Sequence, residues 1–165
     1  MIKLAYVPPY KEMLEYYGHP DGDGDGAPDK KWLDERTELY DLPFTLVGCW
    51  DNRMYNRLRF HVLAGPAIVD ALEEIALKMG PAKVMKYNEL GGAICVRPMT
   101  GSTWLSTHAT GSAIDLNPTI APWQGDPGGQ PREIVNAFES RGFTWGGRWA
   151  SPYRDGHHFD GVGAR

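Results

Sequence analysis

A stretch in the second half of the chain reads Ser106-Thr107-His108-Ala109-Thr110-Gly111-Ser112-Ala113-Ile114-Asp115-Leu116-Asn117-Pro118. If His108 and Asp115 bind one metal ion, their donor atoms must come within about 3–4 Å of each other, because zinc binds its ligands at about 2 Å. Residues seven apart stand about 10 Å apart along one helix and point to opposite faces of one strand. Gly111 can take the positive φ of a turn between them. The stretch therefore predicts a loop, a turn at Gly111 and then a strand over residues 113–116.

A plainer interpretation of this stretch stays open. A single histidine is more often a satisfied core or surface residue than a metal ligand, and Asp115 can simply cap a turn. A second segment favours the metal site, because it supplies another imidazole and a nearby carboxylate within Trp145-Gly146-Gly147-Arg148-Trp149-Ala150-Ser151-Pro152-Tyr153-Arg154-Asp155-Gly156-His157-His158-Phe159-Asp160. Two histidines and one carboxylate, with a fourth position open to water, form a recurrent hydrolytic zinc site.

The predicted elements around these two segments are short and of mixed type. Apolar residues at i, i+4, i+7 and i+11 predict a helix over 64–79 that Gly80-Pro81 ends, and Pro131 opens another helix that ends at Gly142. The remaining predictions are a helix over 10–17, strands over 43–47, 93–96 and 157–160, and loops over 18–29 and 118–130. Helices and short strands without βαβ alternation indicate an α+β fold, and 165 residues suit one domain.

Composition excludes several classes of protein. The net charge is -4 and no basic run occurs, so no nucleic-acid partner is expected. No apolar stretch is long enough for a signal peptide or a membrane span, which predicts synthesis in the cytoplasm without a signal peptide and no membrane insertion. Cys49 and Cys95 are too few for a disulfide framework, and two free thiols are favoured over one bridge.

Taken together, the two segments resemble the signature of a known family. The pattern Ser106-x-His108-x-x-Gly111-x-Ala113-x-Asp115, followed by Asp155-x-x-His158-Phe159, is similar to that of zinc peptidases acting as D-alanyl-D-alanine carboxypeptidases or L-alanyl-D-glutamate endopeptidases. That family includes enzymes of the VanX and VanY type and many phage endolysins. The resemblance covers roughly residues 56–160. It implies a small single domain with a central antiparallel sheet flanked by helices, as in Hedgehog domains and DD-peptidases.

This resemblance also implies a domain organisation and a metal centre. Residues 1–55 become an N-terminal extension packed on the core, and residues 56–165 become the zinc peptidase core. A single catalytic Zn²⁺ is expected on three ligands, His108, Asp115 and His158. His157 competes with His158 for the third position, and adjacent strand residues point to opposite faces. The motif spacing favours His158.

Further roles are carried over from the resemblance. Asp155 matches the catalytic acid/base, and Ser106 matches a serine that supports the site. Arg97 matches an arginine that polarises the scissile carbonyl, where negative charge develops, although a surface ion pair is the alternative. His61 and His19 have no support from the motif. Four aromatic residues flank the motifs and are expected mainly in the core, with one or two walling a substrate groove: Trp104, Trp145, Trp149 and Tyr153.

The function expected from this resemblance is that of a zinc-dependent peptidoglycan peptidase that hydrolyses cell-wall stem peptides with metal-activated water. An endolysin-type L-alanyl-D-glutamate endopeptidase of phage origin is preferred, acting as a monomer that reaches the wall after a holin opens the membrane. Three alternatives stay open. They are a D-Ala-D-Ala carboxypeptidase of the VanY type, a Hedgehog-like metal-binding signalling domain, and a non-catalytic virion component stabilised by zinc.

An acidic loop near the N-terminus suggests a second metal. Its carboxylates occupy positions 1, 3, 5 and 9 of a calcium-loop pattern, with Gly26 at position 6, and come from Asp21, Asp23, Asp25 and Asp29. The acid expected at position 12 is replaced by Trp32. Structural Ca²⁺ and a solvated acidic turn are therefore both open interpretations.

Overall fold

The computed structural model describes residues 1–163, and over these residues one sheet contains six strands in the order β2-β1-β3-β4-β6-β5. The strands are β1 (Thr37–Gly48), β2 (Met54–His61), β3 (Glu89–Gly92), β4 (Ala113–Leu116), β5 (Thr144–Trp145) and β6 (His158–Asp160). β1 and β3 run parallel, and every other neighbouring pair is antiparallel. The predicted α+β fold with a mainly antiparallel sheet is confirmed.

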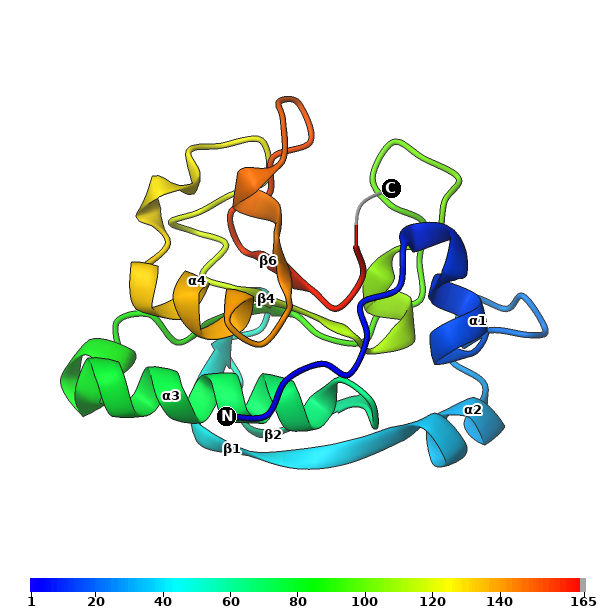
Figure 1. Ribbon diagram of the computed structural model, residues 1–165, viewed down its shortest axis with the longest axis horizontal. Coiled ribbons are helices and arrows are strands. Elements are labelled where there is room, and N and C mark those ends of the chain that lie inside the picture. The colour runs from blue at the N-terminus through cyan, green and yellow to red at the C-terminus, as the bar shows by residue number, and fades with distance from the viewer. Residues whose placement is uncertain (164–165) are drawn as a thin grey trace.

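The helices lie along the sheet and at its ends. The α-helices are α1 (Met13–Tyr17), α2 (Lys30–Arg36), α3 (Gly65–Val84) and α4 (Arg132–Glu139). Short 3-10 turns are η1 (Tyr10–Glu12), η2 (Thr107–Thr110), η3 (Pro127–Gly129) and η4 (Gly146–Arg148). In Figure 1, α4 lies directly above α3, and α3 also packs against β1. Within residues 1–163, no helix combines the length and the apolar character that crossing a membrane requires.

The longest helix, α3, follows the apolar periodicity of its sequence. Ile68, Leu72 and Ile75 are buried in the main core, and Pro66 lies in the first turn of the helix. Gly80 has a φ of 71°, so the regular helix breaks there, and a short helical turn follows it. The predicted break at Gly80 is confirmed.

The hairpin of β1 and β2 is larger than the sequence predicts. A strand is expected over 43–47 only, whereas β1 runs from Thr37 to Gly48, and β2 and α2 were not predicted. Leu58 and Phe60 of β2 are buried while Arg57 and Arg59 are exposed, which is the alternation of a half-buried strand. Since β2 begins at Met54, the sheet runs across the boundary predicted at residue 55.

The strand predicted over 93–96 is wrong, because the observed strand β3 covers Glu89–Gly92. At Gly91, β3 lies so close to its neighbour β4 that an added Cβ would be 2.9 Å from the Cβ of Asp115. This position therefore requires glycine. Ala93 and Cys95 lie beyond the strand and use their main-chain polar groups on His108 instead of on the sheet.

β4 and β6 pair at the centre of the fold and set the two faces of the site. Asp115 lies directly opposite His158, and Ile114 lies opposite Phe159. Side chains alternate between the faces of a sheet, so the two polar residues share one face and the two apolar residues share the other. Ile114 and Phe159 are fully buried in the main core. The predicted strand over 113–116 is confirmed, and the one predicted over 157–160 begins one residue later.

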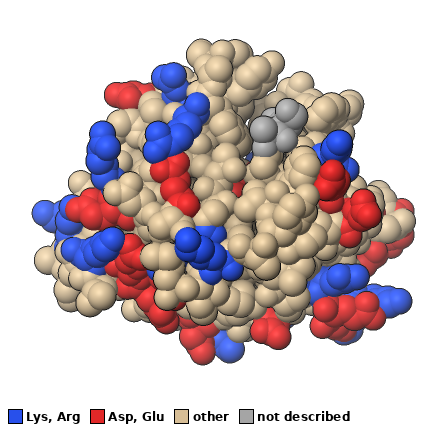
Figure 2. All heavy atoms as spheres, in the orientation of Figure 1, with Lys and Arg blue, Asp and Glu red and all other residues tan. Residues whose placement is uncertain are grey.

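The N-terminal segment packs beside the C-terminal end of the described chain. In Figure 1 it runs past α3 to reach α1, close to the segment that follows β6. Met13, Tyr17 and Val162 form a second small core, and the Tyr17 hydroxyl donates to the main-chain oxygen of Gly161 over 2.9 Å. On the face shown in Figure 2, acidic and basic side chains are interspersed with one another.

Candidate metal centre and active site

Three side chains converge on one point above β4 and β6. His108 Nε2 lies 3.1 Å from Asp115 Oδ1, His158 Nδ1 lies 2.8 Å from the same oxygen, and the two nitrogens are 3.1 Å apart. All three residues are buried. Two imidazole nitrogens and one carboxylate oxygen are the donor set of hydrolytic zinc sites. The structure thus brings together the three predicted ligands in a group that can hold a metal ion.

The turn that carries His108 forms as its sequence predicts. The Ser106 side chain caps η2 by accepting from the His108 N–H over 3.4 Å. Gly111 ends η2 in the left-handed region with a φ of 68°, and its N–H donates to the His108 carbonyl. A Cβ at Gly111 would also lie 3.0 Å from the main-chain nitrogen of His61. The loop, turn and strand predicted for this stretch are confirmed, and Ser106 acts on the site through the main chain of His108.

Neighbouring oxygens orient both histidine rings. His108 Nδ1 lies 2.6 Å from the Ala93 carbonyl oxygen, so this nitrogen donates and Nε2 turns its lone pair toward Asp115. His158 Nε2 faces Asp160 Oδ2 at 3.4 Å and the Thr107 hydroxyl at 3.4 Å, which leaves Nδ1 for the site. The donor set therefore fits a metal in its protonation pattern as well as its composition. Sequence reasoning missed Asp160, although its position two residues after His158 on one strand places both on one face.

The buried charges of this group shift each other's pKa. Burial alone would raise the pKa of Asp115, but the charges and hydrogen bonds of His108 and His158 hold it well below its usual range. Burial would lower the pKa of His158, yet hydrogen bonds to Asp115 and Asp160 raise it to about 10. Asp115 is therefore an anion at neutral pH, and a bound cation would take the place of the proton on His158.

Asp155 lies at the edge of the same site, in the loop before β6. Burial raises the pKa of its carboxyl, and the nearby negative charge of Asp115 adds to that rise, against the opposing charges of His158 and His157. Its Oδ1 lies 3.0 Å from His157 Nε2. A partly buried carboxylate of raised pKa beside a candidate metal site has the properties of a general acid or base.

His157 lies just before β6, so the alternation of strand residues does not turn it away from the site. Its Nδ1 lies 3.0 Å from the Ala121 carbonyl oxygen, and its Nε2 lies between Asp155 and Asp115, at 3.0 and 3.9 Å. It stays outside the group of three converging ligands. Asp155 Oδ1, the oxygen beside it, is buried and has no hydrogen-bond partner among the described residues. His61, by contrast, is a satisfied core residue whose Nε2 lies 2.9 Å from the Tyr17 carbonyl oxygen.

The main chain at Arg97 and Pro98 pairs with the main chain at Leu105 and Ser106, and this pairing brings Arg97 to the site. The Ser106 N–H donates to the Arg97 carbonyl over 2.9 Å, and Pro98 forms a bridge with Leu105. The Arg97 side chain is exposed, and its guanidinium donates to the Pro98 carbonyl oxygen. Within residues 1–163 it makes no ion pair, so the alternative of a surface ion pair finds no partner there.

A cleft of about 350 Å³ opens over the three ligands. Arg97, Ser106 and Asp155 line it together with the ligands, so the predicted catalytic residues and the predicted zinc ligands face one space. Of the four flanking aromatics, Trp145 packs on the core, whereas Trp104 is 54% exposed and Tyr153 is 61% exposed. The expectation that most of them build the core is wrong. Trp149 and Tyr153 wall the cleft instead.

The acidic loop brings three of its four aspartates together. Ligand atoms of Asp21, Asp23 and Asp25 lie within 4.8 Å of one another, while the Asp29 carboxylate accepts from the Gly22 N–H over 2.7 Å. The Asp21 carboxylate accepts from N–H groups of its own loop, including that of Asp25. Such a loop is stable as a solvated turn, and calcium binding stays a prediction.

Comparison with known proteins bears on the part of the chain that carries the ligands. No curated protein and no solved structure matches the chain. A family model described as D-alanyl-D-alanine carboxypeptidase matches residues 100–161, which include the three converging ligands and Asp155 but not Arg97. The chain is therefore similar to the peptidases of this family over the segment that forms its candidate metal centre, and the match supports the family without distinguishing among its subfamilies.

Proposed function

We propose that this protein is a zinc-dependent peptidase that hydrolyses the stem peptides of bacterial peptidoglycan. The observation that carries the proposal is the convergence of His108, Asp115 and His158 within 3.1 Å beside a partly buried Asp155. The family match over residues 100–161 supports a peptidase of this type.

The residues of the site divide the chemical work among them. His108, Asp115 and His158 would hold a Zn²⁺ ion, which would supply Lewis acidity and make a water molecule easier to deprotonate. Asp155 accepts the proton of the attacking water and returns it to the leaving amine, a task that its raised pKa favours. Arg97 places its positive charge in the cleft, where it stabilises the negative charge that develops on the scissile carbonyl oxygen. His157 Nε2 lies 3.0 Å from Asp155 Oδ1, beside the proposed general base.

The bond that is cut and the biological setting belong to this proposal as well. An L-alanyl-D-glutamate endopeptidase of the phage endolysin type is preferred, because the ligand motif resembles that of endolysins. In that setting the enzyme acts as a monomer on wall peptides after a holin opens the membrane. A D-Ala-D-Ala carboxypeptidase is the second candidate, and the description of the matching family favours it.

Digestion of purified peptidoglycan tests both the activity and the bond. We expect zinc-loaded protein to release fragments whose masses identify the cleaved bond, and we expect a chelator to abolish their release. His108→Ala should lose zinc and activity together, whereas Asp155→Asn should keep about one zinc per chain and lose at least about a hundredfold in turnover, as removal of a general base does.

The matched pair of variants separates catalysis from structural zinc. If Asp155→Asn releases fragments at the wild-type rate, the assigned general base is wrong. If chelated wild type still cleaves the wall, the metal mechanism is wrong. A protein that binds zinc and cleaves no wall peptide would support a stabilising role of the metal in a virion component or a signalling domain.

A further inference from the structure

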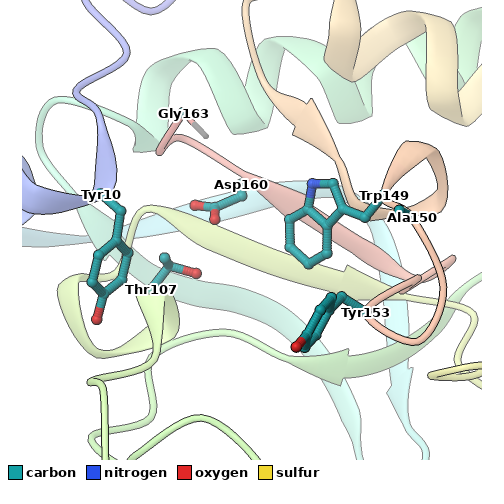
Figure 3. A pocket seen from close by; sticks show the side chains of 7 residues that line it. All are labelled: Tyr10, Thr107, Trp149, Ala150, Tyr153, Asp160 and Gly163. Carbon is teal, nitrogen blue, oxygen red and sulfur yellow. The ribbon is translucent and has the colours of Figure 1, made fainter. Parts of the chain in front are cut away.

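A second cavity of about 460 Å³ adjoins the metal cleft. Aromatic side chains form much of its wall, and Figure 3 shows Tyr10 on one side and Trp149 with Tyr153 on the other. Thr107 also lines the cavity, and so does Ala150, which is exposed. Thr107, Trp149 and Tyr153 line the metal cleft as well, so the two spaces are neighbours.

Among the described lining residues, Asp160 alone brings a carboxylate to this aromatic cavity. Asp160 is 3% exposed, and in Figure 3 its carboxylate lies between the rings of Tyr10 and Trp149. Its Oδ1 accepts from the Val162 N–H over 3.0 Å, and its Oδ2 lies 3.4 Å from His158 Nε2. A carboxylate offers about four acceptor positions, so capacity is left for a ligand. Among residues 1–163, the lining of this cavity includes no lysine or arginine.

Aromatic faces and a buried carboxylate together select for positive charge. A cation is attracted by the negative face of an aromatic ring, and the attraction grows when water is excluded. The electrostatic attraction of a carboxylate is likewise stronger in a partly buried site than in water. A neutral apolar group would fill the space and bury the Asp160 carboxylate further, but it would add no polar partner to those that Asp160 already has.

We propose that this cavity is a substrate subsite for a primary ammonium group on a flexible side chain, such as that of a diamino-acid residue within a peptide. The inference rests on the proposed peptidase function and names the feature of the substrate that the protein selects. Thr107, Trp149 and Tyr153 border both the metal cleft and the cavity. A peptide in the cleft would therefore place one of its side chains past Thr107 in the cavity. The ammonium then lies against the aromatic rings and the Asp160 carboxylate.

Calorimetric titration with two matched peptides tests the subsite. The probes are L-Ala-γ-D-Glu-L-Lys-D-Ala and the same peptide with norleucine in place of lysine, and the protein is zinc-loaded Asp155→Asn, so that binding is measured with turnover suppressed. We expect the lysine peptide to bind about tenfold more tightly, in line with the strength of partly buried cation–aromatic contacts.

A variant pair at Ala150 makes the test specific, because Ala150 is exposed and lines this cavity but not the metal cleft. Ala150→Lys places a competing cation at the edge and should remove the preference for lysine, while the uncharged Ala150→Gln should retain it. If the two peptides bind with equal affinity, or the norleucine peptide binds more tightly, the subsite proposal is wrong. The binding of both peptides would still support the proposed peptidase function. If neither peptide binds and wild type cleaves neither, the proposed function fails and the subsite fails with it.

Discussion

Two buried clusters of charged side chains in this domain use their polar atoms in opposite ways. Arg141, which is 2% exposed, donates to the carboxylates of Asp70 and Glu74 and to the main-chain oxygens of Ala137 and Asp70. This cluster joins α3 to the segment after α4, and each donor group of the guanidinium has an acceptor. It is complete with protein groups alone.

The cluster over β4 and β6 has the reverse arrangement. His108 and His158 each turn one nitrogen toward a neighbouring oxygen and the other toward Asp115. Three potential ligand atoms therefore face one point, and a cation completes the set. The comparison teaches that burial of charge alone does not mark a functional site. The direction in which the remaining lone pairs point distinguishes a structural cluster from a ligand-binding one.

The largest expected difference between the clusters is in stability. Arg141→Ala should lower the free energy of unfolding by about 3 kcal/mol, because it leaves two carboxylates without their buried partner. In chelator-treated protein, His108→Ala should cost less, since His108 donates one hydrogen bond to Ala93, yet this variant alone should abolish zinc binding. Urea unfolding followed by circular dichroism, with zinc content by mass spectrometry, measures both. An equal loss of stability in the two variants would contradict the distinction.

Asp160, whose carboxylate faces His158 Nε2, provides a second test of the comparison. Asp160→Asn should weaken zinc affinity about 10- to 100-fold, as loss of an orienting partner of a ligand does, because the carboxylate no longer holds His158 Nε2. Competition with a chromophoric chelator measures the affinity. Thr107→Val removes the other oxygen near Nε2 and serves as the control with a smaller effect. An unchanged zinc affinity in Asp160→Asn would show that Asp160 does not orient the ring.

Zinc binding should depend on pH through His158. Its pKa of about 10 in the metal-free protein means that the ring is protonated at pH 7, so binding must release that proton. The apparent association constant should rise by about tenfold per pH unit from pH 7 toward 9, and the rise should cease above the pKa. Calorimetry in buffers of different ionisation enthalpy counts the released protons. A pH-independent affinity over this range would exclude a protonated His158 in the metal-free state.

The smallest expected effect concerns the acidic loop. If calcium binds to Asp21, Asp23 and Asp25, adding it should raise the melting temperature by about 2–4 °C, equivalent to about 1 kcal/mol in a chain of this size. The measurement belongs in the His108→Ala variant, so that chelators act on calcium and not on the zinc site. Asp23→Asn should remove the response. A melting temperature that ignores both calcium and chelator would mean that the loop is a solvated turn.

The pattern of apolar residues predicted those elements whose structure depends on neighbouring residues in the sequence. The apolar face of α3 and the compact run of β4 are of this kind. β1 was predicted too short because Pro43 and several polar residues interrupt its pattern, and its length comes from pairing with β2. β3 was predicted too late because its register depends on the close approach to β4 at Gly91, which no local pattern encodes.

The candidate site divides in the same way. The spacing of His108 and Asp115 around Gly111 carries its own geometry, and the structure brings these residues together with His158. Burial of the Asp155 carboxyl and the contact of Asp160 with His158 arise only when separate loops and strands assemble. The sequence argument about His157 assumed a strand at that residue, whereas the strand begins one residue later.

The docking of Tyr10 beside the cavity has a consequence for how this protein diversifies. Tyr10 lies in the segment that packs on Val162 and Leu105, some ninety positions before the start of the matched family segment at residue 100. Under the subsite proposal, the groups that bind metal and part of the wall that selects a side chain are encoded in separate stretches of the gene. Under that proposal, substitutions at and around Tyr10 would change the preference for a substrate side chain and leave the three proposed metal ligands unchanged.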